Sequence, residues 1–300
     1  MALTRIVVDE IAARPTGESP LNYMRDCLIA GGWVEDKTVY DGAWVQEIYF
    51  HSTHATEPIF ISAQSSAHIV DTVYQHVWWY TQLGFDTGLA VDQQPNGLTT
   101  TLNPPSYNSV LFAWAGRVSF DCFINSECVY FSFFEGNLIN SATVDRYERG
   151  TRQNVYMAGT ITPYMSFSGG QFARHGHRSG EDGIAIYDSF YFEGNWYNTN
   201  VNAVNGLVCG TRVHDAAGAA QRTGNLRTGG IILFPYVQYV DTDPSTTNTL
   251  WTALGEWPFV YYQRYGTVWN KLIQHEGRDY FSKVAENPSN RIYYLFDITP

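Results

Sequence analysis

Residues 117–134 read RVSFDCFINSECVYFSFF and predict a β-hairpin. Apolar residues occupy every second position from 118 to 124, which is the period of a strand with one buried face. The returning half, residues 127–134, is apolar at positions of both faces. A strand of that kind is central in a sheet or is covered by a partner subunit.

Cys122 and Cys128 flank the turn of this hairpin. A loop with an odd number of residues centred on Asn125 would put them on one sheet face, whereas a two-residue loop at Asn125 and Ser126 would put them on opposite faces. With Cys27 and Cys209 they make four cysteines without a C-x-x-C, which fits neither a disulfide scaffold nor a zinc site. We expect reduced, packed thiols.

The composition favours a subunit of an assembly. Of 300 residues, 44% are hydrophobic and 16% aromatic, and aromatic residues are frequent in strands and at interfaces. Only three of the 18 cationic residues are lysines, and protein interfaces are depleted in Lys and enriched in Tyr, Trp and Arg.

The net charge of −11 repels phosphate backbones, so we expect no direct binding of nucleic acid. No apolar run reaches the roughly 18 residues of a membrane span, and the first residues lack the apolar core of a signal peptide. Synthesis in a cytoplasm without membrane insertion is therefore expected.

The predicted fold is mainly β, with antiparallel sheets in a sandwich or barrel-like arrangement and one short N-terminal helix. Residues 1–18 are expected to form an extended arm, and residues 19–300 a β-rich structural domain. Ser19 and Pro20 signal the start of the helix, and Gly31-Gly32 its end. Gly, Asn and Ser accumulate at about 136–230, which predicts a loop-rich insertion that contacts neighbouring subunits.

His175 and His177 form the H-x-H pair of the chain. On a strand they would share a face and could bind one metal ion, which Glu181 and Asp182 could complete. The surrounding glycines favour a loop instead, so neither a metal site nor a cofactor is predicted.

Aromatic and arginine side chains are the expected contact residues, because such side chains anchor interfaces. The candidates for subunit contacts or ligand binding are Trp78, Trp79, Arg174, Arg178, Trp196, Tyr197, Trp257 and Tyr261. No catalytic residue is predicted, since the chain has no P-loop, HExxH, GxSxG or GxGxxG motif.

Short sequence segments, here called blocks, occur along the chain in the same order as in a known protein family. They are residues 23–33 (ending Ala-Gly-Gly-Trp), 45–52, 58–64, 79–86, 112–118, 128–133, 254–262 (LGEWPFVYY), 277–281 and 293–296. Together they resemble a family of tailed-bacteriophage virion structural proteins, whose segment corresponding to residues 254–262 reads LGExPgVY, with a glycine before Val-Tyr. This chain departs from that block with the bulky Trp257 and Phe259.

The resemblance implies a non-enzymatic structural subunit of the virion, in the tail, baseplate or neck. Such a subunit would assemble in the bacterial cytoplasm as a symmetric homo-oligomer with neighbouring virion proteins. One alternative is a surface module that binds a host glycan or receptor through Trp196 and Tyr197 by stacking. Another is a glycosidase-like enzyme that uses Asp182 or Glu193, since paired carboxylates perform glycoside hydrolysis.

Overall fold

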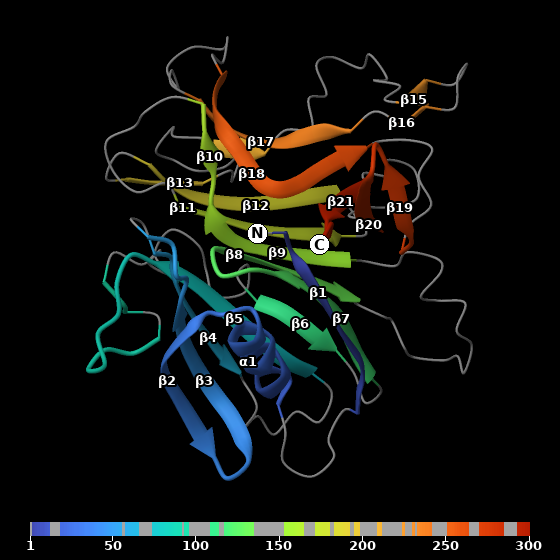
Figure 1. The fold of residues 1–300 in the computed structure, drawn as a ribbon. Helices are drawn as coiled ribbons and strands as arrows, with labels where there is room; N and C mark the ends of the chain where they lie inside the picture. Colours follow the sequence, from blue (N-terminus) through green and yellow to red (C-terminus); the bar gives the residue numbers. More distant parts are fainter. Residues whose placement is uncertain are drawn as a thin grey trace. The chain divides into compact units, whose positions relative to one another are not determined.

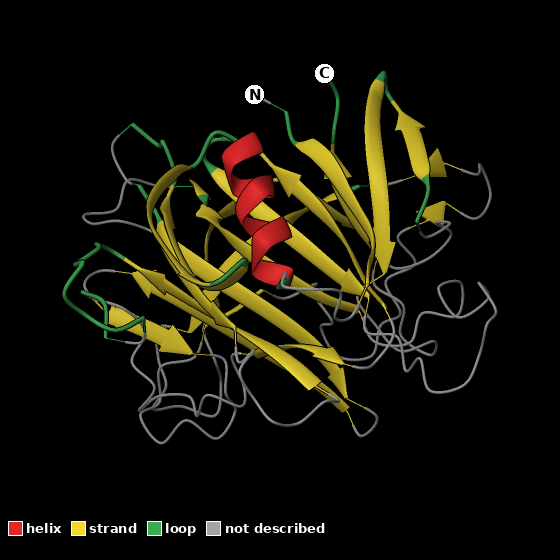
Figure 2. Ribbon diagram, turned by 90° about the horizontal axis from the view of Figure 1, so that it is seen from below, coloured by secondary structure: helices red, strands yellow, loops and turns green. Residues whose placement is uncertain are grey.

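The computed structural model describes part of the chain. The described residues are 2–12, 19–55, 58–65, 74–91, 93–95, 109–113, 117–134, 153–164, 172–180, 183–192, 195–198, 209–211, 224–225, 230–231, 233–241, 251–263, 270–284 and 293–300. They form antiparallel sheets and one helix, which confirms the predicted mainly β fold (Figures 1 and 2). Within these residues no sheet closes into a barrel.

The chain divides into two compact units, Thr4–Ala158 and Met1–Leu3 with Gly159–Pro300. The first unit contains one sheet ordered β1-β7-β8-β9 and a five-stranded meander ordered β2-β3-β4-β5-β6. Its elements are β1 (Thr4–Ala12), α1 (Pro20–Ala30), β2 (Val34–Asp41), β3 (Trp44–His51), β4 (Phe60–Ser65), β5 (Tyr74–Gln82), β6 (Ser109–Ala113), β7 (Arg117–Ile124), β8 (Cys128–Phe134) and β9 (Gln153–Thr160).

Strand β1 occupies half of residues 1–18, the segment expected to form an extended arm. Its residues pair with β7 from Thr4↔Ile124 to Ala12↔Arg117, with a bulge between Val8 and Ile11. The Arg5 guanidinium also reaches the buried Asp121 carboxylate of β7, at 2.8 Å. Because this carboxylate is buried, the ion pair fixes β1 in the sheet.

The hairpin predicted at 117–134 is confirmed as β7 and β8. The register pairs Ile124 with Val129, and the Asn125 amide donates to the Cys128 carbonyl at 3.0 Å. The two-residue loop is therefore Ser126-Glu127, one residue later than the even-numbered alternative. Such a register puts Cys122 and Cys128 on opposite sheet faces, and both are free, buried thiols.

Helix α1 packs against strands of both sheets of its unit, among them β3 and β7. Its predicted apolar stripe is buried completely at Leu21, Met24 and Leu28. At its start, the Ser19 amide donates to Asn22 Oδ1 at 2.9 Å, and the Ser19 hydroxyl donates to the Val45 carbonyl at 2.7 Å. These bonds attach the first turn to β3, so this short helix is stabilised by docking.

The second unit contains the strand order β11-β12-β13, a larger sheet ordered β14-β17-β18-β21-β20-β19 with β10 on β18, and the small pair β15-β16. Its strands are β10 (Thr162–Pro163), β11 (Phe172–Gly180), β12 (Gly183–Phe192), β13 (Asn195–Asn198), β14 (Cys209–Thr211), β15 (Gly224–Asn225), β16 (Gly230–Ile231), β17 (Phe234–Asp241), β18 (Trp251–Gln263), β19 (Leu272–His275), β20 (Arg278–Val284) and β21 (Tyr293–Asp297).

The stretch expected as a loop-rich insertion at about 136–230 contains the long hairpin of β11 and β12. Nine consecutive pairs join these strands, from Phe172↔Tyr191 to Gly180↔Gly183. The loop expected around His175 and His177 is therefore wrong, because both residues lie on β11. Residues 181 and 182 lie outside the described part. The apolar partner strand β12, GIAIYDSFYF, supplies the pairing that the composition of β11 does not signal.

Candidate interaction surface

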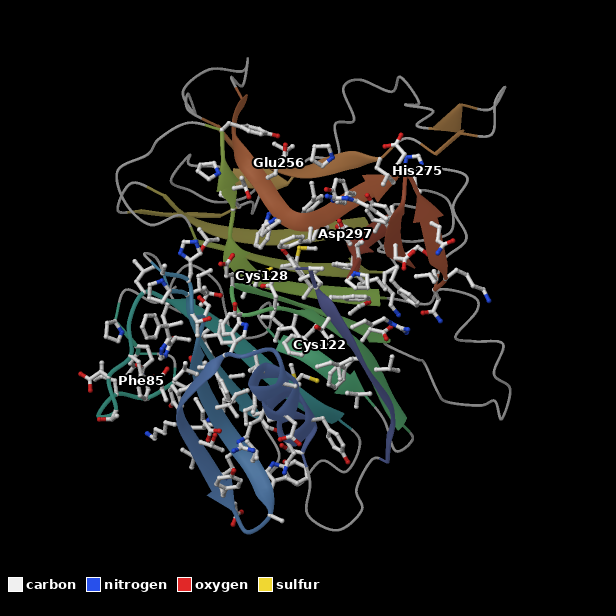
Figure 3. All side chains as sticks on the ribbon, in the orientation of Figure 1. Phe85, Cys122, Cys128, Glu256, His275 and Asp297 are labelled. Atoms are coloured by element: carbon white, nitrogen blue, oxygen red, sulfur yellow. The ribbon has the colours of Figure 1, made fainter. Side chains whose placement is uncertain are left out.

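Three neighbouring strands of the C-terminal sheet bring together Tyr261 of β18, Arg278 and Tyr280 of β20, and Asp297 of β21. We call these four residues the Tyr–Arg cluster. The register pairs Tyr280 with Asp297, and Tyr261 with Leu295 two residues earlier on the same face. Figure 3 labels Asp297 on β21 among the side chains of this sheet.

A buried carboxylate holds the exposed arginine of the cluster. Arg278 Nη1 lies 2.7 Å from Asp297 Oδ2, and the two side chains are 55% and 4% exposed. Asp297 Oδ1 also accepts hydrogen bonds from the Thr299 amide at 3.0 Å and from its hydroxyl at 2.5 Å. The carboxylate thus has its own partners and orients a guanidinium that remains accessible to solvent.

The two tyrosine rings pack edge to face, with centroids 5.5 Å apart and an angle of 88° between the planes. Burial raises the pKa of both phenols, and the nearby Asp297 carboxylate raises them further. The pKa of Arg278 is also raised, chiefly by Asp297. At neutral pH the cluster therefore has an exposed cation beside two protonated phenols, of which Tyr261 is partly exposed and Tyr280 is buried. Arg and Tyr are among the residue types that dominate binding energy at protein interfaces.

Strand β18 carries a large bulge beside this cluster. Its register joins Tyr261 to Pro235 and Glu256 to Val237, so residues 257–260 face the single residue Tyr236. Within the bulge Phe259 has a φ of 63°, in the left-handed region that glycine adopts without steric cost.

Gly255 lies on β18 just before the bulge, and strand β10 passes close to this glycine. A Cβ atom added to Gly255 would lie 2.3 Å from the Thr162 carbonyl oxygen. The Tyr164 hydroxyl, just after β10, donates to Glu256 Oε1 at 2.8 Å (Figure 3 labels Glu256). The close approach of the two strands thus requires a residue without a side chain at position 255.

Gly31, Gly32 and Trp33 end helix α1. The Gly32 amide donates to the Ile29 carbonyl and the Trp33 amide to the Leu28 carbonyl, each at 3.0 Å, while Gly32 has a φ of 84°. This is a Schellman motif. A Cβ added to Gly31 would lie 2.4 Å from the Ile124 side chain, so this glycine lets the helix end lie against the 117–134 hairpin.

The structure places the predicted contact residues in different environments. Tyr261 belongs to the Tyr–Arg cluster. Trp257 is only 1% exposed, so its prediction as a surface contact is wrong, because the β18 bulge turns it into a core residue. Trp78 and Trp79 lie on β5, opposite Gln64 and Ala63, and only their backbone is described.

The remaining candidates lie on β11 and β13, again with only the backbone described. The register through β12 puts Arg174, Arg178 and Trp196 at positions of one sheet face, and Tyr197 at a position of the other. Trp196 and Tyr197 therefore do not share a face on which one sugar could stack. Asp182 and Glu193, the candidate glycosidase acids, lie outside the described residues.

Sequence reasoning missed Arg278, Tyr280 and Asp297. Arg278 and Tyr280 occupy alternate positions in block 277–281, which would have suggested that they share a strand face. Their convergence with Tyr261 and Asp297 depends on the order of three strands, which no local pattern reveals.

Where side chains are described, no group of three or more His, Cys, Asp or Glu residues is arranged to hold a metal ion. The one helix in the described part has neither the length nor the hydropathy to cross a membrane. No protein-family model matches the chain, and no curated protein matches it.

Proposed function

We propose that the chain is a structural subunit of a tailed-phage particle, in the tail, baseplate or neck. It assembles as a symmetric homo-oligomer and contacts neighbouring virion proteins. The observation that carries the proposal is the left-handed backbone of Phe259, because this is the position at which the family segment LGExPgVY has glycine.

The resemblance rests on amino-acid identities, whereas the φ of Phe259 is a property of the backbone. The glycine-type conformation falls at the one glycine position of the segment that this chain fills with another residue, and this supports the resemblance independently of residue identity. Gly255, the other glycine of the segment, is required by the close approach of β10. Both positions therefore support a shared backbone for residues 254–262.

The block at residues 23–33 supports the same proposal. Its final Gly-Trp supplies the left-handed residue and the last amide donor of the Schellman motif. Trp33 then donates from Nε1 to the Asn125 carbonyl at 2.8 Å, next to the block at 128–133. The last residue of one block is thus bonded to the turn that precedes another block.

The Tyr–Arg cluster is the surface that we assign to a subunit contact. Its arginine is exposed but held by a buried carboxylate, so little side-chain entropy is lost when a partner binds. The scarcity of lysine in the chain agrees with a surface that is largely covered in an assembly.

The test is the composition of particles. Virions purified by density gradient from a lysate of the cells that make the chain should contain it at a constant ratio to the major capsid protein, measured by quantitative mass spectrometry. Negative-stain images of the purified chain should show a closed symmetric oligomer. Its absence from particles that retain infectivity would disprove the virion role, and a monomer in the images would disprove the homo-oligomer.

A further inference from the structure

Strand β11 places both histidines of the H-x-H pair on one face of a sheet. His175 and His177 are two residues apart on a strand whose pairing with β12 is continuous. Alternate positions of a strand lie on the same face. Because residues 175 and 177 lie on a strand rather than in a loop, both histidines can contribute to one metal site.

The register then supplies a third ligand type. Asp188 is the direct partner of His175, and it is the only charged residue of β12. Directly opposed residues of antiparallel strands have Cα atoms about 4.5–5.5 Å apart, which is within the span of one coordination sphere. Two imidazoles and a carboxylate are a ligand set typical of zinc and related divalent ions.

The described residues of β11, β12 and β13 put no arginine or lysine at a position of this sheet face. Arg174 and Arg178 occupy positions of the opposite face. The nearest same-face positions on β12 are Ile186 and Phe190, and Tyr197 of β13 is paired with Phe190. A divalent cation would therefore meet no competing positive charge from these three strands.

We propose that His175, His177 and Asp188 form a binding site for a divalent transition-metal ion of the zinc type on the β11–β12 hairpin. Asp188 is the carboxylate that the register assigns to the site, because it is the direct partner of His175. Residues 181 and 182 lie outside the described part.

The test is zinc binding to the full chain after treatment with a chelator. Isothermal titration with zinc chloride should give one site per chain, and Co²⁺ should produce a d–d absorption band. His177→Ala and Asp188→Asn should each weaken binding at least tenfold, whereas His275→Ala, on β19, should leave it unchanged. His177 is decisive because its register partner is Ile186, so a simple His175–Asp188 ion pair would not need it.

A second measurement uses the unmodified chain and does not depend on the folding of a variant. Saturating zinc should protect His175 and His177 from carbethoxylation, read by peptide mass spectrometry, and should leave His275 as reactive as before. Failure of the wild-type chain to bind zinc, equal binding by the His177→Ala variant, or unprotected His175 and His177 would each overturn the assignment.

Discussion

Trp33 donates a hydrogen bond from its indole Nε1 to the backbone carbonyl of Asn125 at 2.8 Å, and both residues are buried. The bond joins the residue that follows helix α1 to the turn of the β7–β8 hairpin. Since α1 also packs on β3 and β4, this bond helps to fix the helix between the hairpin and the five-stranded sheet of the same unit.

Replacing Trp33 by Phe should therefore destabilise the first unit. The change removes one buried hydrogen bond, which costs about 1 kcal/mol of unfolding free energy. Trp44→Phe is a matched control, because Trp44 Nε1 is buried without a hydrogen-bond partner among the described residues. Urea unfolding followed by circular dichroism should show the larger loss for Trp33→Phe, and equal losses would contradict the role of the bond.

Removal of the Arg5 guanidinium should weaken the pairing of β1 with β7. Arg5→Ala leaves the buried Asp121 carboxylate without its cation, and breaking a buried ion pair costs about 3 kcal/mol. Asp26→Ala is the control, because Asp26 is 71% exposed in its pair with Arg25, and exposed pairs contribute less than about 1 kcal/mol. Chemical denaturation measures the loss of stability in both variants. Hydrogen exchange of the amides of residues 4–8 should accelerate only in the Arg5→Ala variant.

Phe259 provides a test of the backbone argument. Phe259→Gly and Phe259→Ala both remove the ring, but only glycine relieves the positive φ. Phe259→Gly should therefore be the more stable variant by about 1 kcal/mol, the opposite of the usual order of Ala and Gly in a strand. Thermal unfolding of the two variants shows which one is more stable. A more stable Phe259→Ala variant would remove the main support for the proposed family relationship.

The Tyr–Arg cluster should control assembly. Arg278→Ala removes the exposed cation, and truncation of such an anchor typically costs about 2 kcal/mol or more of association free energy, a rise of roughly thirtyfold in the dissociation constant. Tyr261→Ala is a second variant that retains the Arg278–Asp297 pair, and Lys271→Ala, an exposed cation just before β19, is the control. Sedimentation velocity over a concentration series should show dissociation only for the two cluster variants.

The buried thiols should make stability fall at alkaline pH. Burial raises the pKa of Cys128 to about 12, and burial together with Cys27 raises that of Cys122. An unfolded thiol loses its proton near pH 8.5, so the native state binds more protons above that pH. The contribution of Cys128 to stability is therefore complete below about pH 8.5 and declines, by up to about 1.4 kcal/mol per pH unit, until pH 12.

Unfolding measured at pH 8 and pH 10 should show this loss, and Cys128→Ala should lose less between the two values than the wild type. In the native protein at pH 9 only about one Cys128 in a thousand would be a thiolate, so Ellman's reagent should modify this residue slowly until urea is added. Rapid modification of Cys128 in the folded chain would contradict its burial.

Local patterns were sufficient for helix α1 and for the two strands of the 117–134 hairpin, because the signals for these elements lie within a few residues. They were insufficient for the turn of the hairpin, which is Ser126-Glu127 rather than either loop that the sequence offered. They were also insufficient for β11, where glycine and histidine obscure the strand period and the pairing with β12 decides the conformation. Trp257 was misassigned for a similar reason, because its burial depends on the bulge opposite Tyr236.

The Tyr–Arg cluster could not be predicted because its members meet only after β18, β21 and β20 align in that order. The Leu3 amide donates to the Asp297 carbonyl at 3.3 Å, while the Asp297 carboxylate holds Arg278. One residue of β21 thus bonds residue 3 through its backbone and residue 278 through its side chain. Fraying of the end of β21 would therefore release both contacts together.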